Sequence, residues 1–169
     1  EMSNTPDGPW YYEQIELGNN YRMTDFQAAL GISQLSKLES FVSRRQEIAR
    51  QYGELFQGTS VLLPEQAKNQ ASAFHLYVIR IETSAHAPSR NQVFERLRAN
   101  GVMVNLHYLP IYRHPYYERM GIYNPNEFPN AEKYYKEAIS LPMFPGLEDS
   151  QISEIVRIVN TPIDHQNIF

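Results

Sequence analysis

The chain has 169 residues, enough for one ordinary hydrophobic core, and contains no cysteine, which excludes disulfides and thiolate chemistry. With 42% hydrophobic and 20% charged residues, it has the composition of a soluble globular protein. Its net charge of -4 gives no reason to expect nucleic-acid binding, which calls for a positively charged face. It has neither a bilayer-length apolar run nor a secretory pattern, so we predict a cytoplasmic protein without a membrane partner.

The longest helical pattern of the chain follows a loose N-terminal stretch. Residues 1–7 are polar and turn-forming, without a period. Thr24 and Gln27 then have the spacing of a capping box. The apolar stripe that follows at helical spacing is Leu35, Leu38, Val42, Ala49, Tyr52 and Phe56. A helix over residues 24–56 would reach on the order of 50 Å, so we interpret it as a spine that joins two bodies or two subunits.

Strand and helix patterns alternate after this spine. Residues 61–64 predict a short extended segment, and residues 74–79 have the alternation of a strand. Ser89 begins a second capping box, and Gly101 closes the helix that it predicts. Residues 102–108 are apolar and β-branched enough for a further strand.

The sequence pattern predicts helices in the last third of the chain. Residues 115–121 predict a short one, and Asn130 is expected to cap another that runs through Ala138. The final helix follows Asp149 and carries Ile152, Ile155, Val156 and Val159 at helical spacing. Strands interleaved with helices imply an open sheet covered on one face, a fold class of α/β to α+β. We expect residues 1–57 to form an interdomain segment with the spine helix, and residues 58–169 a small C-terminal α+β domain.

Several separated motifs occur in order. They are Trp-Tyr-Tyr-Glu-Gln at 10–14, Asn-Tyr-Arg-Met-Thr-Asp at 20–25, Phe-His-Leu-Tyr at 74–77, Asn-Leu-His-Tyr-Leu-Pro at 105–110, Phe-Pro-Asn-Ala-Glu at 128–132 and Ser-Leu-Pro at 140–142. Together they resemble the DegT/StrS family of sugar aminotransferases, pyridoxal-phosphate enzymes that act on nucleotide-linked keto sugars. The first motif is most similar to the branch that aminates C4 of a UDP-linked 4-keto-6-deoxy-N-acetylhexosamine, in pseudaminic acid or spore coat polysaccharide biosynthesis.

This resemblance implies the C-terminal portion of a fold-type-I, aspartate-aminotransferase-like enzyme. Such a transaminase needs a lysine that holds the cofactor and an acid that pairs with the pyridine nitrogen. In the family the lysine lies in a Ser-Phe-x-x-x-Lys context upstream of the Asn-Tyr-Arg-Met motif. The lysines of this chain, which lack that context, are Lys37, Lys68, Lys133 and Lys136. We therefore expect the chain to begin within a longer protein, to contain no catalytic residue and to be inactive alone.

Asn20 matches the family asparagine that crosses the dimer interface to the phosphate of the neighbouring subunit's cofactor. A side-chain amide can donate to phosphate oxygens, and the helix start at Thr24 adds free N–H groups. Residue types alone would make Asn19 and Asn20 a turn, but the surrounding motif favours the cofactor role. That role implies a homodimer with shared active sites. The family usually has an aromatic residue where Asn19 stands.

Three further residues are candidates for substrate binding. Arg22 could meet a substrate or phosphate oxygen, or form a salt bridge to Asp25 or Glu13. His107 and Tyr108 match a family pair near the sugar-nucleotide pocket, where an imidazole can donate to a diphosphate or a sugar hydroxyl. A structural role at a strand end is the alternative for His107. The five histidines show no i,i+4 pair, so we expect no metal site.

The predicted function of the intact protein is transfer of an amino group, from glutamate, to a keto carbon of a nucleotide-linked deoxysugar. The product would be of the UDP-4-amino-4,6-dideoxy-N-acetyl-altrosamine type, with pyridoxal 5'-phosphate as cofactor. Two alternatives stay open. One is a sugar dehydratase of the same fold, in which the lysine is replaced, and the other is a dimerisation or regulatory module without catalysis. The sequence leaves the sugar, the nucleotide, the carbon that is aminated and its stereochemistry undetermined.

Overall fold

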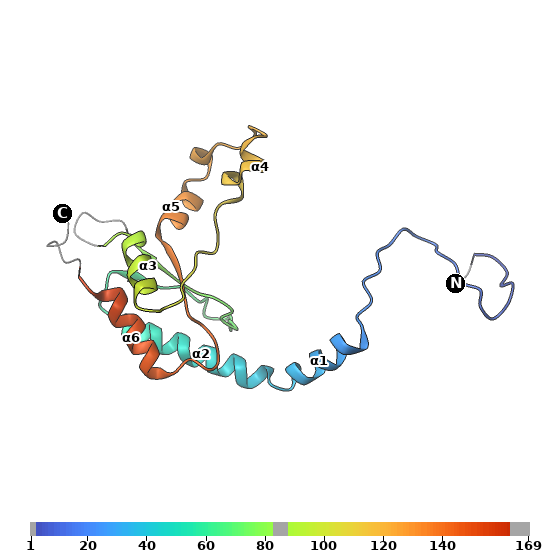
Figure 1. Cartoon of the computed structure of the whole chain (residues 1–169), viewed down its shortest axis with the longest axis horizontal. Coiled ribbons are helices and arrows are strands. Elements are labelled where there is room, and N and C mark those ends of the chain that lie inside the picture. The colour runs from blue at the N-terminus through green and yellow to red at the C-terminus, as the bar shows by residue number, and fades with distance from the viewer. Residues whose placement is uncertain (1–2, 83–87, 163–169) are drawn as a thin grey trace. The chain divides into compact units, whose positions relative to one another are not determined.

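The computed structural model describes residues 3–82 and 88–162 (Figure 1). The chain divides into two compact units, residues 1–37 and residues 38–169. In the first unit, extended chain leads to helix α1 (Asp25–Leu35), none of whose residues is buried. The predicted capping box of this helix is confirmed. The backbone N–H of Gln27 donates to the Thr24 hydroxyl, and the backbone N–H of Thr24 donates to the Gln27 side chain.

The helix predicted over residues 24–56 is two helices in the structure. A break separates α1 from α2 (Leu38–Leu55). At the break the hydroxyl of Ser36 donates to the carbonyl of Ser33 at 2.8 Å, a local bond that competes with the helical pattern. The boundary between the two compact units in the chain also falls at this break, between residues 37 and 38. The predicted division of the chain into residues 1–57 and 58–169 stays a prediction.

The second unit is built on a three-stranded antiparallel sheet with the order β1–β2–β3. The strands are β1 (Val61–Leu62), β2 (Tyr77–Ile81) and β3 (Ala138–Leu141). Because side chains alternate along a strand, Tyr77, Ile79 and Ile81 share one face of β2, where all three are buried. Val78 and Arg80 are half-buried on the opposite face. Strand β2 therefore buries one face more completely than the other, whereas all four residues of β3 are buried.

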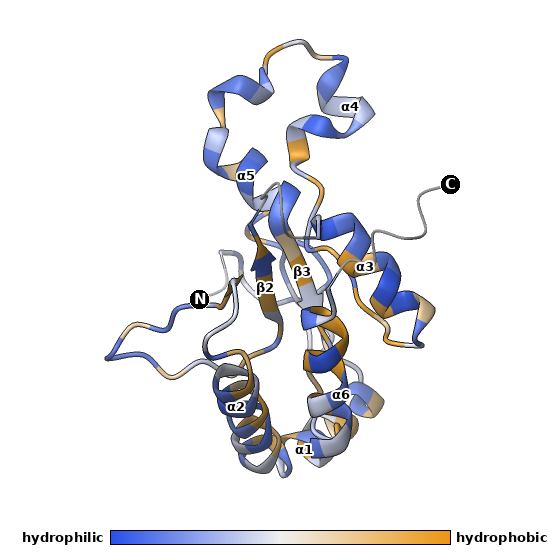
Figure 2. Ribbon diagram, turned by 90° about the vertical axis from the view of Figure 1, so that its left-hand side faces the viewer, coloured by the Kyte–Doolittle hydropathy of each residue, from blue (hydrophilic) through white to orange (hydrophobic). Residues whose placement is uncertain are grey.

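Three helices enclose the core: α2, α3 (Arg90–Ala99) and α6 (Asp149–Asn160). Hydrophobic residues gather on β2, β3 and α6 in Figure 2. The largest fully buried side chains are Tyr52, Ile48, Ile79, Leu97, Ile139, Ile152 and Val93. The predicted inner face of the last helix is confirmed by the burial of Ile152, Ile155, Val156 and Val159. The capping box at Ser89 and the left-handed Gly101 after α3, with a φ of 78°, are also confirmed.

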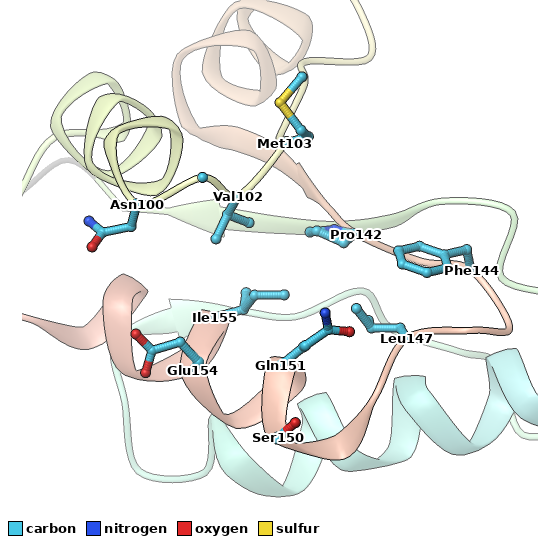
Figure 3. Close-up of a pocket in the computed structure, with 11 residues that line it drawn as sticks. Asn100, Val102, Met103, Pro142, Phe144, Leu147, Ser150, Gln151, Glu154 and Ile155 are labelled. Carbon is cyan, nitrogen blue, oxygen red and sulfur yellow. The ribbon is translucent and has the colours of Figure 1, made fainter.

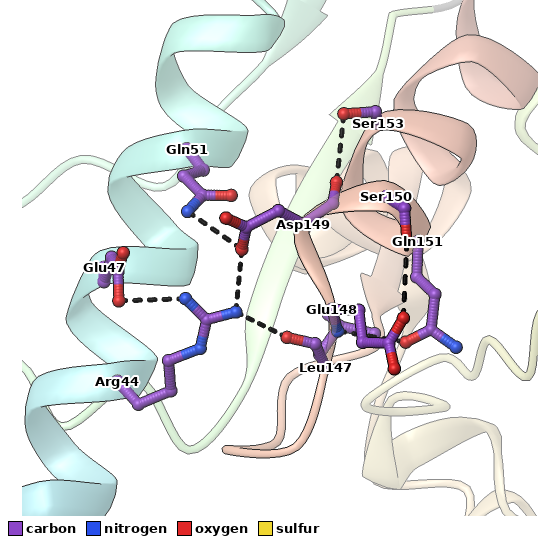
Figure 4. Close-up of polar contacts among 9 residues, drawn as sticks. All are labelled: Arg44, Glu47, Gln51, Leu147, Glu148, Asp149, Ser150, Gln151 and Ser153. Atoms are coloured by element: carbon purple, nitrogen blue, oxygen red, sulfur yellow. Dashed lines mark hydrogen bonds and ion pairs between the residues drawn. The ribbon is translucent and has the colours of Figure 1, made fainter.

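A charged contact connects the start of α6 to α2 (Figure 4). Arg44 of α2 donates through Nη2 to the carbonyl of Leu147 at 2.6 Å and to Oδ1 of Asp149 at 2.8 Å. Its Nη1 lies 2.9 Å from the Glu47 carboxylate. Gln51 donates to the same Asp149 oxygen at 3.2 Å. The contact fixes the turn through which the chain enters its last helix.

Short helices occupy the chain between α3 and β3. They are η1 (Ile111–Arg113), α4 (Pro115–Glu118), η2 (Pro125–Glu127) and α5 (Pro129–Glu137). The short helix predicted over residues 115–121 is α4. The predicted cap at Asn130 is wrong, because Phe128 precedes the helix and Pro129 takes its first position. Proline suits that position because the first N–H groups of a helix have no helical partner.

The strand predicted over residues 102–108 is wrong. In the described part of the chain, this segment pairs only through Asn105, in an isolated bridge to Ser140. The third strand is β3, which begins at Ala138, the residue where the predicted helix was expected to end. Strand formation depends on a partner, and β3 pairs with β2 over four residues whereas residues 102–108 form a single bridge to β3.

Candidate functional site

His107 is bonded directly to the third strand. Its Nδ1 lies 2.8 Å from the hydroxyl of Ser140, a residue that is only 5% exposed. The backbone N–H of Ser140 donates to the carbonyl of Asn105 at 2.8 Å, and the N–H of Asn105 donates back at 3.4 Å. Both the main chain and a side chain of β3 therefore hold the segment that carries the histidine.

Tyr134 and Tyr108 complete the surroundings of this histidine. The Tyr134 hydroxyl, from α5, donates to the carbonyl of His107 at 3.2 Å. Burial raises the pKa of Tyr134, an effect that the positive charge of Arg80 partly offsets, so the hydroxyl stays a neutral donor. The rings of His107 and Tyr108 meet edge to face with centroids 4.5 Å apart, across a cis peptide bond, and Tyr108 is 72% exposed. Nε2 of His107 has no hydrogen-bond partner among the described residues. An imidazole nitrogen and an exposed phenol are thus available to a ligand.

Asn20 lies in the exposed chain that precedes α1. The neighbouring residues form the local bonds of a turn. The N–H of Tyr21 donates to the carbonyl of Asn19 at 3.1 Å, and the Asn19 side chain donates to the Tyr21 hydroxyl at 3.1 Å. The side chain of Asn20 bonds to none of the described residues, so the turn leaves its amide free to donate to a ligand.

Arg22 is exposed and forms no ion pair with the described residues, so the salt bridge to Asp25 or Glu13 that was its alternative role is not formed. Glu13 instead accepts from the Tyr11 hydroxyl at 2.7 Å and from the backbone N–H of Ser3 at 2.6 Å. These two donors lower the pKa of Glu13 to about 2. The guanidinium of Arg22 therefore stays available.

A second polar cluster joins η1 to α5. Arg113 forms a forked ion pair with Glu132, in which Nε lies 2.8 Å from Oε1. This guanidinium holds the pKa of Glu132 below its ordinary value, and the Tyr112 hydroxyl donates to the same carboxylate at 3.0 Å. Arg113 also lies 5.1 Å from the ring centroid of Tyr135. The members of the cluster satisfy one another, so we assign it to structure.

An apolar groove of about 610 Å³ lies between the end of α3 and α6 (Figure 3). Its apolar lining consists of Val102, Met103, Pro142, Phe144, Leu147 and Ile155. The carboxylate of its lining, Glu154, is bound by Arg157 at 2.7 Å and 2.6 Å. The groove contains none of the candidate site residues, and we assign it no catalytic role.

Among the described residues, there are groups suited to bind the phosphate of pyridoxal phosphate but no lysine suited to hold the cofactor. All four lysines are exposed, whereas the lysine that holds this cofactor lies in the cavity around it. The free amide of Asn20 and the N–H groups at the start of α1 suit a phosphate. Across residues 3–82 and 88–162 there is no cluster of three side chains suited to a metal ion, nor any helix with the length and apolarity needed to span a membrane.

Solved structures define the class of protein. A protein of Streptococcus pneumoniae described as a sugar aminotransferase, in its apo form, is 28% identical with a TM-score of 0.80, covering 92% of this chain and 39% of that one. Helicobacter pylori PseC, an aminotransferase of pseudaminic acid biosynthesis, is 26% identical with a TM-score of 0.78, covering 92% and 41%. The Streptococcus protein has also been solved in its PLP and PMP forms. The fold is thus that of the C-terminal part of a fold-type-I PLP transferase, as predicted.

Sequence comparison identifies the family. The sequence model of the DegT/DnrJ/EryC1/StrS aminotransferase family matches residues 2–160, and the chain belongs to this family. It is 34% identical to the spore coat polysaccharide biosynthesis protein SpsC of Bacillus subtilis, over 90% of this chain and 40% of that protein. It is 33% identical to the UDP-4-amino-4,6-dideoxy-N-acetyl-beta-L-altrosamine transaminase of Campylobacter jejuni, over 79% of this chain and 35% of that protein. The chain therefore spans two fifths or less of the length of these relatives.

Sequence reasoning missed two residues of the His107 site. Ser140 belongs to the Ser-Leu-Pro motif, but nothing local indicates that its hydroxyl meets an imidazole 33 positions earlier. Tyr134 lies on α5, and its bond to the backbone of His107 depends on how that helix packs. The motif containing Ser140 was the one signal that could have directed attention to it.

Proposed function

We propose that the full-length protein is a pyridoxal-phosphate-dependent aminotransferase that transfers an amino group from glutamate to the keto carbon of a nucleotide-linked deoxysugar. The family match over residues 2–160 carries this proposal. The name of the Campylobacter jejuni relative supports a product of the UDP-4-amino-4,6-dideoxy-N-acetyl-altrosamine type. In this proposal the catalytic lysine belongs to a preceding part of the full-length protein, upstream of residue 1, and the enzyme works in the cytoplasm.

The second unit supplies substrate contacts in this proposal. The free Nε2 of His107 and the exposed hydroxyl of Tyr108 suit the diphosphate and sugar hydroxyls of a nucleotide sugar. Arg22, in the first unit, could bind a phosphate oxygen with its planar guanidinium. All three roles concern binding, because none of these groups is a lysine able to hold the cofactor.

Asn20 supports a homodimer with shared active sites. Its free amide would donate to the phosphate of the cofactor held by a second copy, with the start of α1 adding positive potential. The first unit also exposes many large apolar side chains, as expected of a surface that is covered in the working enzyme. They include Trp10, Tyr12, Ile15, Leu17, Tyr21, Met23, Phe26 and Leu30.

The reaction can be tested with the full-length protein, pyridoxal phosphate, ¹⁵N-glutamate and a UDP-linked 4-keto-6-deoxy-N-acetylhexosamine. Our proposal expects absorbance from bound cofactor and a product that contains ¹⁵N. A dehydratase would release water from the sugar without incorporating ¹⁵N. A regulatory module would stay colourless and leave the substrate unchanged. Either of these results would replace our proposal.

Shared sites can be tested with mixed dimers. One subunit carries Asn20→Ala and the other lacks the catalytic lysine. If Asn20 acts across the interface, each such dimer retains one complete site, in which the lysine of one subunit meets the asparagine of the other. We expect restored activity in the mixture and almost none in either parent dimer at low cofactor concentration. A mixture as inactive as its parents would show that Asn20 acts within its own subunit.

A further inference from the structure

Ser140 is buried, and its hydroxyl has one partner in the described part of the chain. Ser140 is 5% exposed, and its Oγ lies 2.8 Å from Nδ1 of His107. Among the described residues it makes no second side-chain hydrogen bond. No buried side-chain nitrogen or oxygen in the described part of the chain lacks a partner. The Ser140 hydroxyl and Nδ1 of His107 therefore satisfy each other.

This arrangement decides which atom donates. A buried hydroxyl needs an acceptor for its proton, and a neutral imidazole has one accepting and one donating nitrogen. If Nδ1 of His107 carried the ring proton, it would donate to the serine oxygen, and the Ser140 proton would then have no acceptor among the described residues. When the serine donates instead, Nδ1 is the acceptor and the ring proton lies on Nε2.

The backbone holds both members of the pair in place. The main chain of Ser140 exchanges two hydrogen bonds with Asn105, two residues before His107. On the other side, the Tyr134 hydroxyl donates to the His107 carbonyl at 3.2 Å. The main chain is therefore held on both sides of His107, and Nδ1 is bonded to Ser140. Together these bonds make the ring present Nε2 in a defined direction.

We propose that Ser140 is a positioning residue for His107, which it keeps in the tautomer whose Nε2–H donates to an oxygen of the nucleotide sugar. This inference rests on the proposed substrate role of His107. Ser140 itself touches no substrate and acts only through the ring. Its contribution is to keep Nε2, the nitrogen that faces the ligand, protonated, so that Nε2 donates a hydrogen bond rather than accepts one.

The tautomer can be measured without any substrate. In a long-range ¹H–¹⁵N spectrum of the ¹⁵N-histidine-labelled protein, at a pH where His107 is neutral, we expect Nδ1 to resonate as an acceptor and Nε2 as a protonated nitrogen. His107→Phe assigns the signals. Ser140→Ala should move both nitrogens toward the averaged positions of exchanging tautomers, and Ser140→Thr, which retains the hydroxyl, should not. A proton on Nδ1 in the unaltered protein, or an unchanged Ser140→Ala spectrum, overturns the proposal.

Kinetics of the full-length enzyme separate this inference from the proposed function. Ser140→Ala should raise the KM for the nucleotide sugar by roughly five- to tenfold, the effect of one weakened hydrogen bond, with little change in kcat. Ser140→Thr should restore the KM, and Ser153→Ala, which removes an exposed hydroxyl bonded within α6, should leave it unchanged. If His107→Phe leaves the KM unchanged, the substrate role of His107 fails. If His107→Phe raises it but Ser140→Ala does not, the positioning role alone fails.

Discussion

Two buried tyrosines show how the core changes the chemistry of single residues. The rings of Tyr52 and Tyr77 stack with centroids 4.9 Å apart, and the Tyr52 hydroxyl donates to the carbonyl of Pro142 at 3.1 Å. Burial raises the pKa of Tyr77 to about 12 and that of Tyr52 further, because a phenolate in the core would lose its hydration. Both phenols stay protonated wherever the protein is folded at ordinary pH.

We predict that the free energy of unfolding falls as the pH rises above about 10. The unfolded chain releases tyrosine protons near its ordinary pKa of about 10, whereas the folded state retains that of Tyr77 until about pH 12. The stabilisation is therefore complete below pH 10 and is lost as the pH rises through 12. Urea denaturation over a pH series would measure it. Tyr77→Phe should flatten part of the fall and the exposed Tyr12→Phe should not; equal slopes in the two variants would contradict the prediction.

At low pH, we predict that the contacts of the Glu13 carboxylate are lost when this group is protonated. Its carboxylate accepts from the Tyr11 hydroxyl and from the backbone N–H groups of Ser3 and Asn4, and its pKa is lowered to about 2. A lowered pKa means that the contacts are intact above about pH 4.5 and are lost as the pH falls through about 2. We expect the amide resonances of Ser3 and Asn4 to titrate with a midpoint near pH 2, and Glu13→Gln to abolish the transition. A midpoint near 4.5 would show that the loop does not hold this carboxylate.

At the scale of elements, the contact between α2 and α6 depends on Arg44 more than on Asp149. The guanidinium reaches the carbonyl of Leu147, which would lose a charged donor without it. The Asp149 side chain is 66% exposed, so solvent screens most of its attraction. Arg44 lowers the pKa of Asp149, but that shift converts to little stability at such exposure.

We predict that Arg44→Met lowers the free energy of unfolding by about 1–2 kcal/mol, because it leaves the Leu147 carbonyl without this donor. Asp149→Asn should cost about 0.5 kcal/mol or less. Chemical denaturation of the purified variants would measure both. The matched control is Arg50→Met, which breaks an exposed pair with Glu54 on the same helix and should stay within about 0.5 kcal/mol of the original. Equal losses for Arg44→Met and Arg50→Met would show that the carbonyl contact contributes nothing.

At the scale of the whole molecule, the two units differ in what stabilises them. The buried apolar side chains run from Ile48 to Val159 and all lie in the second unit. No described residue of the first unit is buried, although α1 is largely apolar around its circumference. A helix of this composition is normally covered by other protein. The second unit therefore holds the whole described core.

We predict that residues 38–169 alone unfold cooperatively, with a free energy within about 0.5 kcal/mol of that of the 169-residue chain. The reason is that removing residues 1–37 deletes no core side chain. Urea denaturation followed by circular dichroism would provide the midpoint and slope. As a control, a chain that begins at residue 57 loses Ile48, Tyr52 and Phe56 and should fail to fold. An unfolded 38–169 chain would show that the first unit supports the second.

Local signals carried much of the sequence prediction. Thr24 and Ser89 cap their helices and Gly101 follows α3 because capping and left-handed backbone depend on residues only a few positions apart. The family could also be identified from its motifs, since these are contiguous stretches that comparison with relatives recognises. The same motifs identified His107 and Asn20 as candidate site residues. The functional roles of these two residues stay predictions.

The tertiary structure decided what depends on partners far apart in the chain. β3 is a strand because it pairs along its length with β2, whereas residues 102–108 pair with β3 only through the single bridge of Asn105 to Ser140. The same pairing brings the Ser140 hydroxyl to His107, a contact that no local pattern encodes. Sequence alone thus determined the family and the helix caps at Thr24 and Ser89, which follow from residues close together in the chain. The strand order and the surroundings of the histidine follow from long-range packing, whose free energy is gained only when the whole unit folds.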